Sequence, residues 1–190
     1  MTHWYTADTH FGDVGLMRFF GRPFRSAQAM DAAMIEAVAA RVKPDDDLWI
    51  VGDFALAGAY VDLAHAARVF ALLPGRKHLV RGNHDPEAVL ELGWASVHHI
   101  AEVEDGNRRV VLGHYPLVTW PGVRDGALHL FGHVHTNWEG CQGAVNVGVD
   151  WWDFAPIRVE QAEPRALSLP ESPLFWQAER LLRCRWSMAA

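Results

Sequence analysis

The sequence predicts an α/β fold. Strand-like and helix-like patterns alternate over the first 95 residues, polar side chains gather where each expected strand ends, and the pattern turns mainly to β afterwards. In α/β folds the loops that leave the carboxyl ends of neighbouring strands converge and build a site there. Half of the 190 residues are apolar, and the chain has nine Trp and nine Phe. This composition predicts one domain with a substantial core.

The first half of the chain carries the alternation of strands and helices. A short aromatic strand is followed by an amphipathic helix, a nearly all-apolar strand, a second helix and a third strand, at residues 4–6, 29–42, 48–54, 61–73 and 78–80. The second of these strands is of the kind that is buried on both faces of a sheet. Each strand runs into a polar loop, so the polar residues are expected at one edge of the sheet.

The second half reads as β-structure up to residue 161. Five segments are expected to contain strands, at residues 96–104, 110–116, 127–135, 143–150 and 156–161. Asp105 and Gly106 indicate a hairpin turn between the first two. We expect one domain over residues 1–162. Residues 163–190 are expected to form a tether up to residue 173 and a helix that covers the domain or a partner with Leu174, Phe175, Leu181 and Leu182.

Charge and cysteine content argue against several classes of protein. With 17 basic and 23 acidic residues, the formal net charge of −6 disfavours broad capture of nucleic acid or of an anionic membrane surface. Cys141 and Cys184 form no CxxC pattern, so neither a disulfide framework nor a thiolate zinc site is indicated. No signal peptide and no apolar run of membrane-spanning length is found. We expect a cytoplasmic protein, and the sequence leaves its oligomeric state open.

Two histidines follow the apolar run at residues 128–131. In an extended segment, residues i and i+2 point the same way, so His133 and His135 would aim at one spot. A polar rim on a sheet explains this pair when it is taken alone, but four other segments at expected strand ends favour a metal site. These segments carry Asp8, His10, Asp53, Asn83, His84, Asp85 and His114. Carboxylate, amide and imidazole donors without a thiolate suit Mn, Fe or Zn.

The ordered motifs DTH, GD, GNHD, GH and GHVH resemble those of the calcineurin-like metallophosphoesterases, and the resemblance spans residues 8–135. The opening of the chain and residues 148–160 also look like the small stand-alone bacterial and phage members of that superfamily. The resemblance implies a four-layer αββα sandwich of two mixed β-sheets flanked by helices. It also implies a dinuclear metal centre at the strand ends.

The resemblance further implies a role for each motif residue. One metal would be held by Asp8, His10 and His135, the other by Asn83, His114 and His133, and Asp53 would bridge the two. His84 would stabilise developing charge or protonate the leaving oxygen during in-line attack of a hydroxide shared by the metals. Asp85 would fix the orientation of the His84 ring. Manganese is the expected metal, with iron, zinc or nickel as alternatives.

The substrate is less directly indicated than the metal site. Arg18 and Arg22 lie among three phenylalanines at residues 18–25, where arginine could clamp a phosphate while a ring stacks on a base. The simpler alternative is that the phenylalanines anchor the loop in the core and the arginines face water. The absence of an obvious inserted cap domain favours diesters of small molecules or nucleotides. A nuclease of the same superfamily is disfavoured by the lack of Lys/Arg clusters, and a non-catalytic scaffold for protein partners by the intact motifs.

Overall fold

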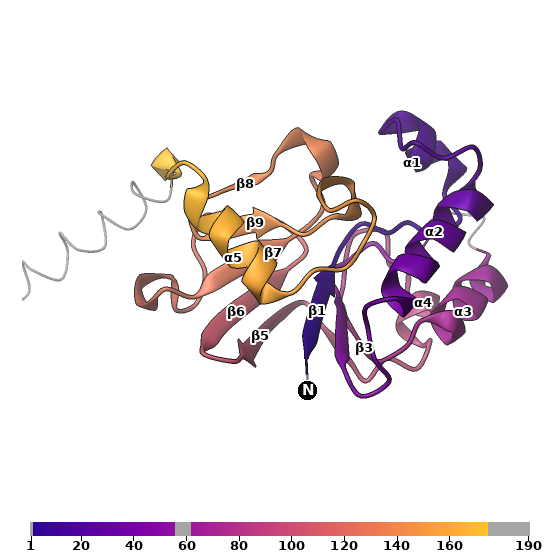
Figure 1. Ribbon diagram of the computed structural model, residues 1–190, viewed down its shortest axis with the longest axis horizontal. Helices are drawn as coiled ribbons and strands as arrows, with labels where there is room; N and C mark the ends of the chain where they lie inside the picture. Colours follow the sequence, from indigo (N-terminus) through magenta and orange to yellow (C-terminus); the bar gives the residue numbers. More distant parts are fainter. Residues whose placement is uncertain (1, 56–61, 175–190) are drawn as a thin grey trace, which may run out of the picture.

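Two β-sheets form the centre of the computed structural model, which describes residues 2–55 and 62–174 (Figure 1). The first sheet has the strand order β1-β2-β3-β4, and the second has the order β5-β6-β7-β9-β8. Buried side chains of both sheets pack against each other in one apolar cluster, with Tyr5 and Trp49 from the first sheet and Leu112 and Leu130 from the second. Two sheets flanked by helices is the architecture that the sequence predicts.

The first sheet is entirely parallel. Its strands are β1 (His3–Thr6), β2 (Asp47–Ile50), β3 (Arg76–Val80) and β4 (Ser96–His98). All four residues of β2 are buried, as expected for an apolar strand that is covered on both faces. Because the strands are parallel, the loops that follow β1, β2 and β3 leave from the same edge.

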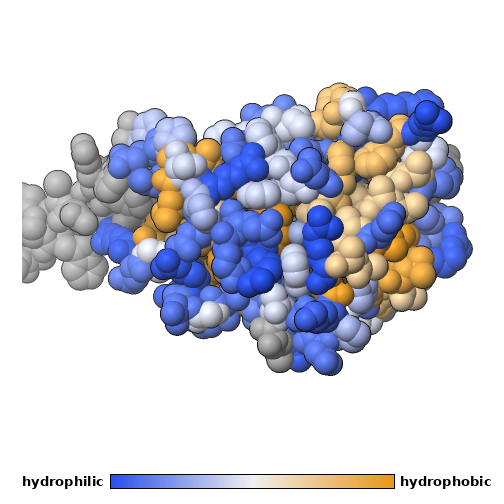
Figure 2. Space-filling view, in the orientation of Figure 1, coloured by the Kyte–Doolittle hydropathy of each residue, from blue (hydrophilic) through white to orange (hydrophobic). Residues whose placement is uncertain are grey.

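Helices cover the outer face of the first sheet (Figure 1). They are α1 (Val14–Phe19), α2 (Ala27–Ala39), α3 (Leu63–Leu72) and α4 (Glu87–Leu90). Ser26 caps the N-terminus of helix α2: its hydroxyl accepts a hydrogen bond from the backbone N–H of Ala29 at 3.1 Å. Its residues Met30 and Met34 pack against the sheet, whereas its outer side is rich in alanine, and Figure 2 shows a hydrophobic area over this helical layer.

The second sheet is mixed. Its strands are β5 (Ile100–Asp105), β6 (Arg108–Gly113), β7 (Leu128–Phe131), β8 (Gly140–Cys141) and β9 (Ala144–Asn146), with the short 3-10 helices η1 (Val123–Asp125), η2 (His135–Asn137) and η3 (Val149–Trp151) between and after them. The antiparallel pair β5-β6 is the hairpin predicted from Asp105 and Gly106. Strands β6, β7 and β9 are parallel neighbours, so β6 and β7 deliver their loops to one edge.

The expected strand at residues 96–104 is interrupted at His99. Residues 96–98 form β4 in the first sheet, and β5 begins at Ile100 in the second sheet. A single apolar and polar alternation can therefore belong to two sheets when the chain crosses from one to the other.

The described helices include none that is long and apolar enough to cross a membrane.

Helix α5 (Val159–Ser168) corrects two sequence predictions. Only Ile157 of the expected strand at residues 156–161 pairs with a strand residue, in one antiparallel bridge to Tyr5. Residues 163–168 of the expected tether belong to α5, so the packed domain continues beyond residue 162. The reason is the helical spacing of Val159, Ala162 and Ala166, which are all buried in the cluster between the sheets. Most of the expected C-terminal helix lies outside the described residues.

Candidate metal centre

The motif residues come together at one edge of the two sheets. Asp8 and His10 follow β1, Asp53 follows β2, and Asn83 with His84 follows β3; His114 and His133 follow β6 and β7, and His135 opens η2. These elements are far apart in the sequence, but the parallel strands deliver their loops to the same place. The sequence prediction that polar strand ends converge is therefore correct.

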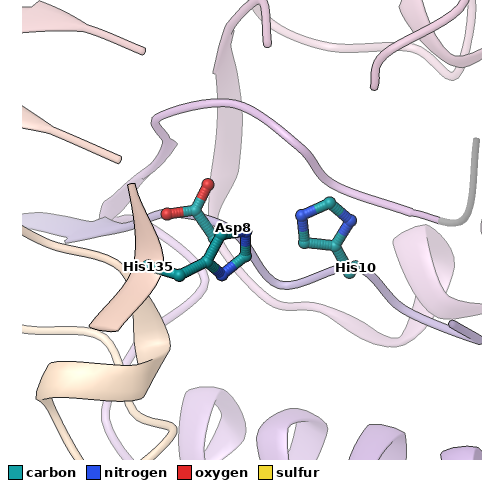
Figure 3. A group of neighbouring side chains, drawn as sticks. All are labelled: Asp8, His10 and His135. Atoms are coloured by element: carbon teal, nitrogen blue, oxygen red, sulfur yellow. The ribbon is translucent and has the colours of Figure 1, made fainter. Parts of the chain in front are cut away.

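The first group of donor atoms belongs to Asp8, His10 and His135. One ligand atom of each residue lies within 4.8 Å of the others, and all three side chains are buried. Figure 3 shows these side chains gathered in one place, with Asp8 and His10 on the loop after β1. The ring centroids of His10 and His135 are 5.2 Å apart. This set of one carboxylate and two imidazoles could hold a divalent cation.

The second group belongs to Asp53, His114 and His133, whose ligand atoms also lie within 4.8 Å of one another. Asn83 joins this group, because its Oδ1 is 3.0 Å from Nε2 of His114. Oδ2 of Asp53 lies 3.3 Å from Nε2 of His114 and 3.4 Å from Nε2 of His10. The carboxylate of Asp53 therefore faces both groups, which is the position that a bridging ligand requires.

The ring of His10 shows that the donor set fits a cation. Within residues 2–55 and 62–174, neither ring nitrogen of His10 has a hydrogen-bond partner, although the residue is only 1% exposed. The approach of Nε2 to Asp53 lacks the geometry of a hydrogen bond. A buried polar group without a partner costs roughly 1–3 kcal/mol, so buried polar atoms are normally paired. A metal ion supplies a partner that the imidazole and the surrounding carboxylates can share.

Two histidines have a hydrogen-bond acceptor beside Nδ1, which leaves Nε2 as the ring atom for a ligand role. Nδ1 of His114 lies 3.0 Å from the carbonyl oxygen of Val51, which can only accept a hydrogen bond. Nδ1 of His135 lies 3.0 Å from Oδ2 of Asp150. If Nδ1 carries the proton in both rings, each Nε2 presents a lone pair to its group. Carboxylate or carbonyl partners of this kind fix the ring and tautomer of many metal-binding histidines.

The charges at the site favour a cation. Burial raises the pKa of Asp8, despite the nearby His135 and His114 rings. Burial also opposes ionisation of Asp53 and His114, but their mutual attraction prevails: the pKa of Asp53 is held well below its usual range, and that of His114 is raised to about 9. Two buried carboxylates thus stabilise positive charge beside them, whether a proton or a metal ion carries it.

The structure has two sheets flanked by helices, and two groups of donor atoms lie at the strand ends. This is the arrangement that the resemblance of the motifs to those of the calcineurin-like metallophosphoesterases implies. No protein-family model matches it. The Gene 66 protein of Mycobacterium phage L5 is 26% identical over 181 residues, which cover 78% of this chain and 86% of the phage protein.

Solved structures resemble this chain to different degrees. AQ665 from Aquifex aeolicus, a protein of unknown function, superposes with a TM-score of 0.70 and 25% identity, over 86% of this chain and 98% of that chain. YfcE, a phosphoesterase from E. coli, superposes with a TM-score of 0.49 and 16% identity over 78% of each chain.

Strained backbone is concentrated at the candidate ligands. Seven non-glycine residues in the described ranges have positive φ, and five of them are candidate ligands: Asp8, His10, Asp53, His133 and His135, with φ from 46° to 71°. Positive φ is uncommon outside glycine, although Asp and His tolerate it better than most residues. Such strain persists only where the surrounding structure over-determines it, and it clusters at functional sites.

Asp85 corrects a sequence prediction. Its carboxylate accepts hydrogen bonds from the backbone N–H groups of Asp53, Phe54 and Gly82, at 2.9, 2.9 and 2.8 Å. Both oxygens are therefore directed at the backbone, and Asp85 joins the loops after β2 and β3 instead of orienting the His84 ring. The prediction failed because the turn at residues 82–85 points adjacent side chains in different directions. His84 is exposed, its N–H donates to Oδ1 of Asp53 at 2.8 Å, and its ring lies 5.3 Å from that of His10.

Arg22 neither faces water nor is free to bind substrate, so both sequence interpretations of it are wrong. It is 5% exposed and forms a two-point ion pair with Asp150, through Nε at 2.8 Å and Nη2 at 3.0 Å. It also donates to the carbonyl oxygens of Thr9 at 3.1 Å and Asp8 at 2.7 Å. One guanidinium thus holds the loop that carries two candidate ligands, and through Asp150 it supports His135. Arg18 is exposed on α1, so the prediction that it contacts substrate stays a prediction.

Sequence reasoning missed Asp150 as part of the site. Asp150 lies 128 residues from Arg22 in the chain. It occurs in the segment GVDWWDF, which carried the family resemblance but no expected ligand. An acidic residue soon after an apolar strand was the available signal.

Glycines at the motifs make room for the ligands. A Cβ atom built on Gly52 would lie 2.1 Å from Nδ1 of His114, and one built on Gly82 would lie 2.2 Å from Oδ1 of Asp53. The sequence predicts these glycines as sites of tight backbone turning. Gly52 fits that prediction with a φ of 90°. At both positions, however, a candidate ligand side chain lies so close to the glycine backbone that there is no room for a Cβ atom.

Proposed function

We propose that this protein is a metal-dependent phosphoesterase that hydrolyses phosphate esters, with a preference for diesters of small molecules or nucleotides. The observation that carries the proposal is the pair of His and Asp groups that share Asp53, with the unpartnered buried ring of His10 beside it. Paired divalent ions held by nitrogen and oxygen donors are typical of phosphate ester hydrolysis.

The proposed cofactor is two divalent metal ions, with manganese first and iron, zinc or nickel as alternatives. The donors are imidazoles, carboxylates and the Asn83 amide, and this mixture accepts several first-row metals. When bound, the ions would neutralise the phosphoryl oxygens and lower the pKa of water at the site. Asp8, His10 and His135 would hold one ion, Asn83, His114 and His133 the other, and Asp53 both.

His84 is the proposed acid catalyst. Its backbone N–H is fixed by Asp53, its side chain is exposed, and its ring lies next to His10. From this position the imidazolium can donate a proton to the leaving oxygen while a hydroxide, formed by loss of a proton from water to solvent, attacks phosphorus from the opposite side. The P–O bond to the leaving group breaks as the new P–O bond forms, and no protein nucleophile is needed.

The first test is hydrolysis of bis-p-nitrophenyl phosphate and of p-nitrophenyl phosphate by chelator-stripped protein, with and without added Mn²⁺. We expect activity that depends on metal and that is higher on the diester. His84→Ala should bind as much metal as the original protein and lose about a hundredfold or more in rate. Metal-loaded protein that hydrolyses neither ester would overturn the proposal, and equal metal loss in His84→Ala would show that His84 is a ligand.

A further inference from the structure

Phe19 is the most exposed large hydrophobic residue of the described structure, at 81%. It is the last residue of α1 and lies beside Phe20, with ring centroids 4.9 Å apart and the planes at 81°. Phe20 in turn stacks on the candidate ligand His135, with centroids 4.0 Å apart and planes at 19°. An uninterrupted aromatic path therefore leads from the first donor group to an exposed phenyl ring.

A second exposed aromatic ring lies at the other donor group. Tyr115 is 50% exposed, and its ring is 4.4 Å from that of His133 and 5.2 Å from that of His114. It follows His114 directly in the chain, so the same loop carries a ligand and an aromatic side chain. Phe20, with Phe19 beyond it, thus lies beside the first donor group, and Tyr115 lies beside the second.

Packing explains some aromatic residues of the first loop but not Phe19. Phe24 contacts Phe154 at 4.7 Å and belongs to the cluster between the first sheet and its helices. The expectation that phenylalanines anchor this loop in the core holds for Phe24. Phe19 buries little of its ring, and a scattered exposed Leu or Phe would need no explanation. Phe19 differs from such a residue because it contacts Phe20, which stacks on the candidate metal ligand His135. This position indicates a role in binding substrate.

We propose that Phe19 and Tyr115 form two stacking subsites for planar rings carried by the ester substituents of the substrate, such as nucleotide bases. This inference rests on the proposed function, because the donor groups between the subsites would hold the phosphate. An aromatic face favours a planar ring over an alkyl chain or a sugar, and it accepts any base because every base has a π-face. One subsite beside each donor group fits a diester, whose phosphorus carries two substituents.

The kinetic test compares two diesters with the same leaving group, bis-p-nitrophenyl phosphate and methyl p-nitrophenyl phosphate, on Mn²⁺-loaded protein. The ratio of their kcat/KM values isolates the contribution of the second ring. We expect Phe19→Ala or Tyr115→Ala to lower this ratio by roughly tenfold, the size of one base–aromatic stack. Leu72→Ala is the matched control, since Leu72 is 62% exposed and ends α3 shortly before β3 begins, at the opposite edge of the sheet. It should leave the ratio unchanged.

A binding measurement keeps the inference testable if neither diester is a substrate. Calorimetry on the Mn²⁺-loaded protein gives the Kd values of AMP and of ribose 5-phosphate. Because both ligands present the same phosphate ester, the ratio of the two Kd values measures the contribution of the base to binding. We expect AMP to bind at least tenfold more tightly, and Phe19→Ala, Tyr115→Ala or the double variant to remove that preference. Equal affinities for the two ligands, or a ratio that neither variant moves, would overturn the stacking subsites. Absence of hydrolysis with the AMP preference intact would overturn the esterase proposal alone.

Discussion

Replacement of Arg22 by methionine tests whether one buried guanidinium organises the first donor group. Methionine retains much of the side-chain volume but removes the charge and the hydrogen bonds that the guanidinium makes, two to Asp150, one each to the carbonyls of Thr9 and Asp8, and one to Sδ of Met30. Asp150 remains behind as a buried carboxylate, with Nδ1 of His135 at 3.0 Å from it. The change therefore breaks a buried ion pair instead of replacing it.

The expected magnitude follows from that burial. Removal of one partner of a buried ion pair costs about 3–5 kcal/mol, because the other charge stays uncompensated. In a domain of this size each kcal/mol lowers Tm by roughly 2–4 °C. We therefore expect Arg22→Met to lower the free energy of unfolding by about 3–5 kcal/mol and Tm by roughly 6–20 °C, in metal-free protein. The ion that Asp8, His10 and His135 would hold should also bind more weakly.

Urea unfolding of the chelator-treated variants measures this effect. Arg18→Met is the matched control, since Arg18 is exposed on the same segment and should change stability by no more than about 0.5 kcal/mol. Adding Asp150→Asn to Arg22→Met should recover part of the loss, because the unpaired charge is removed. A loss below about 1 kcal/mol in Arg22→Met, or strict additivity of the two substitutions, would refute the assigned role.

Three further predictions concern the loops around the site. Asp53→Ala should release both metals and abolish hydrolysis; retention of two ions by elemental analysis would contradict the bridging position of Asp53. Asp85→Asn should lower the free energy of unfolding by about 2–4 kcal/mol, since its amide N–H₂ would face a backbone donor, and an unchanged urea midpoint would contradict this. Burial lowers the pKa of His129 to about 4, so below pH 6.5 the unfolded chain binds a proton that the folded protein excludes. Stability should fall by about 3 kcal/mol between pH 6.5 and 4, and His129→Leu should flatten this decline; equal slopes would contradict the account.

The strand ends that carry ligands could be predicted from sequence because each depends on local pattern. An apolar run followed by a polar motif shows where a strand stops, and parallel strands then bring the motifs together. Asp53, His114 and His133 illustrate this, since the loops after β2, β6 and β7 place their donor atoms within 4.8 Å. No long-range contact had to be known to expect that outcome.

The side chains that support the ligands could not be read in the same way. The partnership of Arg22 and Asp150 depends on how a loop after α1 meets η3, and neither residue has a local pattern that reveals burial. Asp85 was misassigned because its direction is set by turn geometry and not by its position next to His84. Helix α5 was misread because Pro164 and the polar residues around it resemble a linker, while its buried alanines contribute little to an apolar pattern.

The left-handed backbone at five candidate ligands has a consequence for how the site acquires metal. Each such residue carries a conformational cost of order 1–3 kcal/mol, which the packing of the surrounding structure must offset. Because the backbone at each ligand is fixed by that packing, we expect metal binding to order the loops little and to cost little conformational entropy. Metal uptake should therefore be fast and should leave the far-UV circular dichroism unchanged.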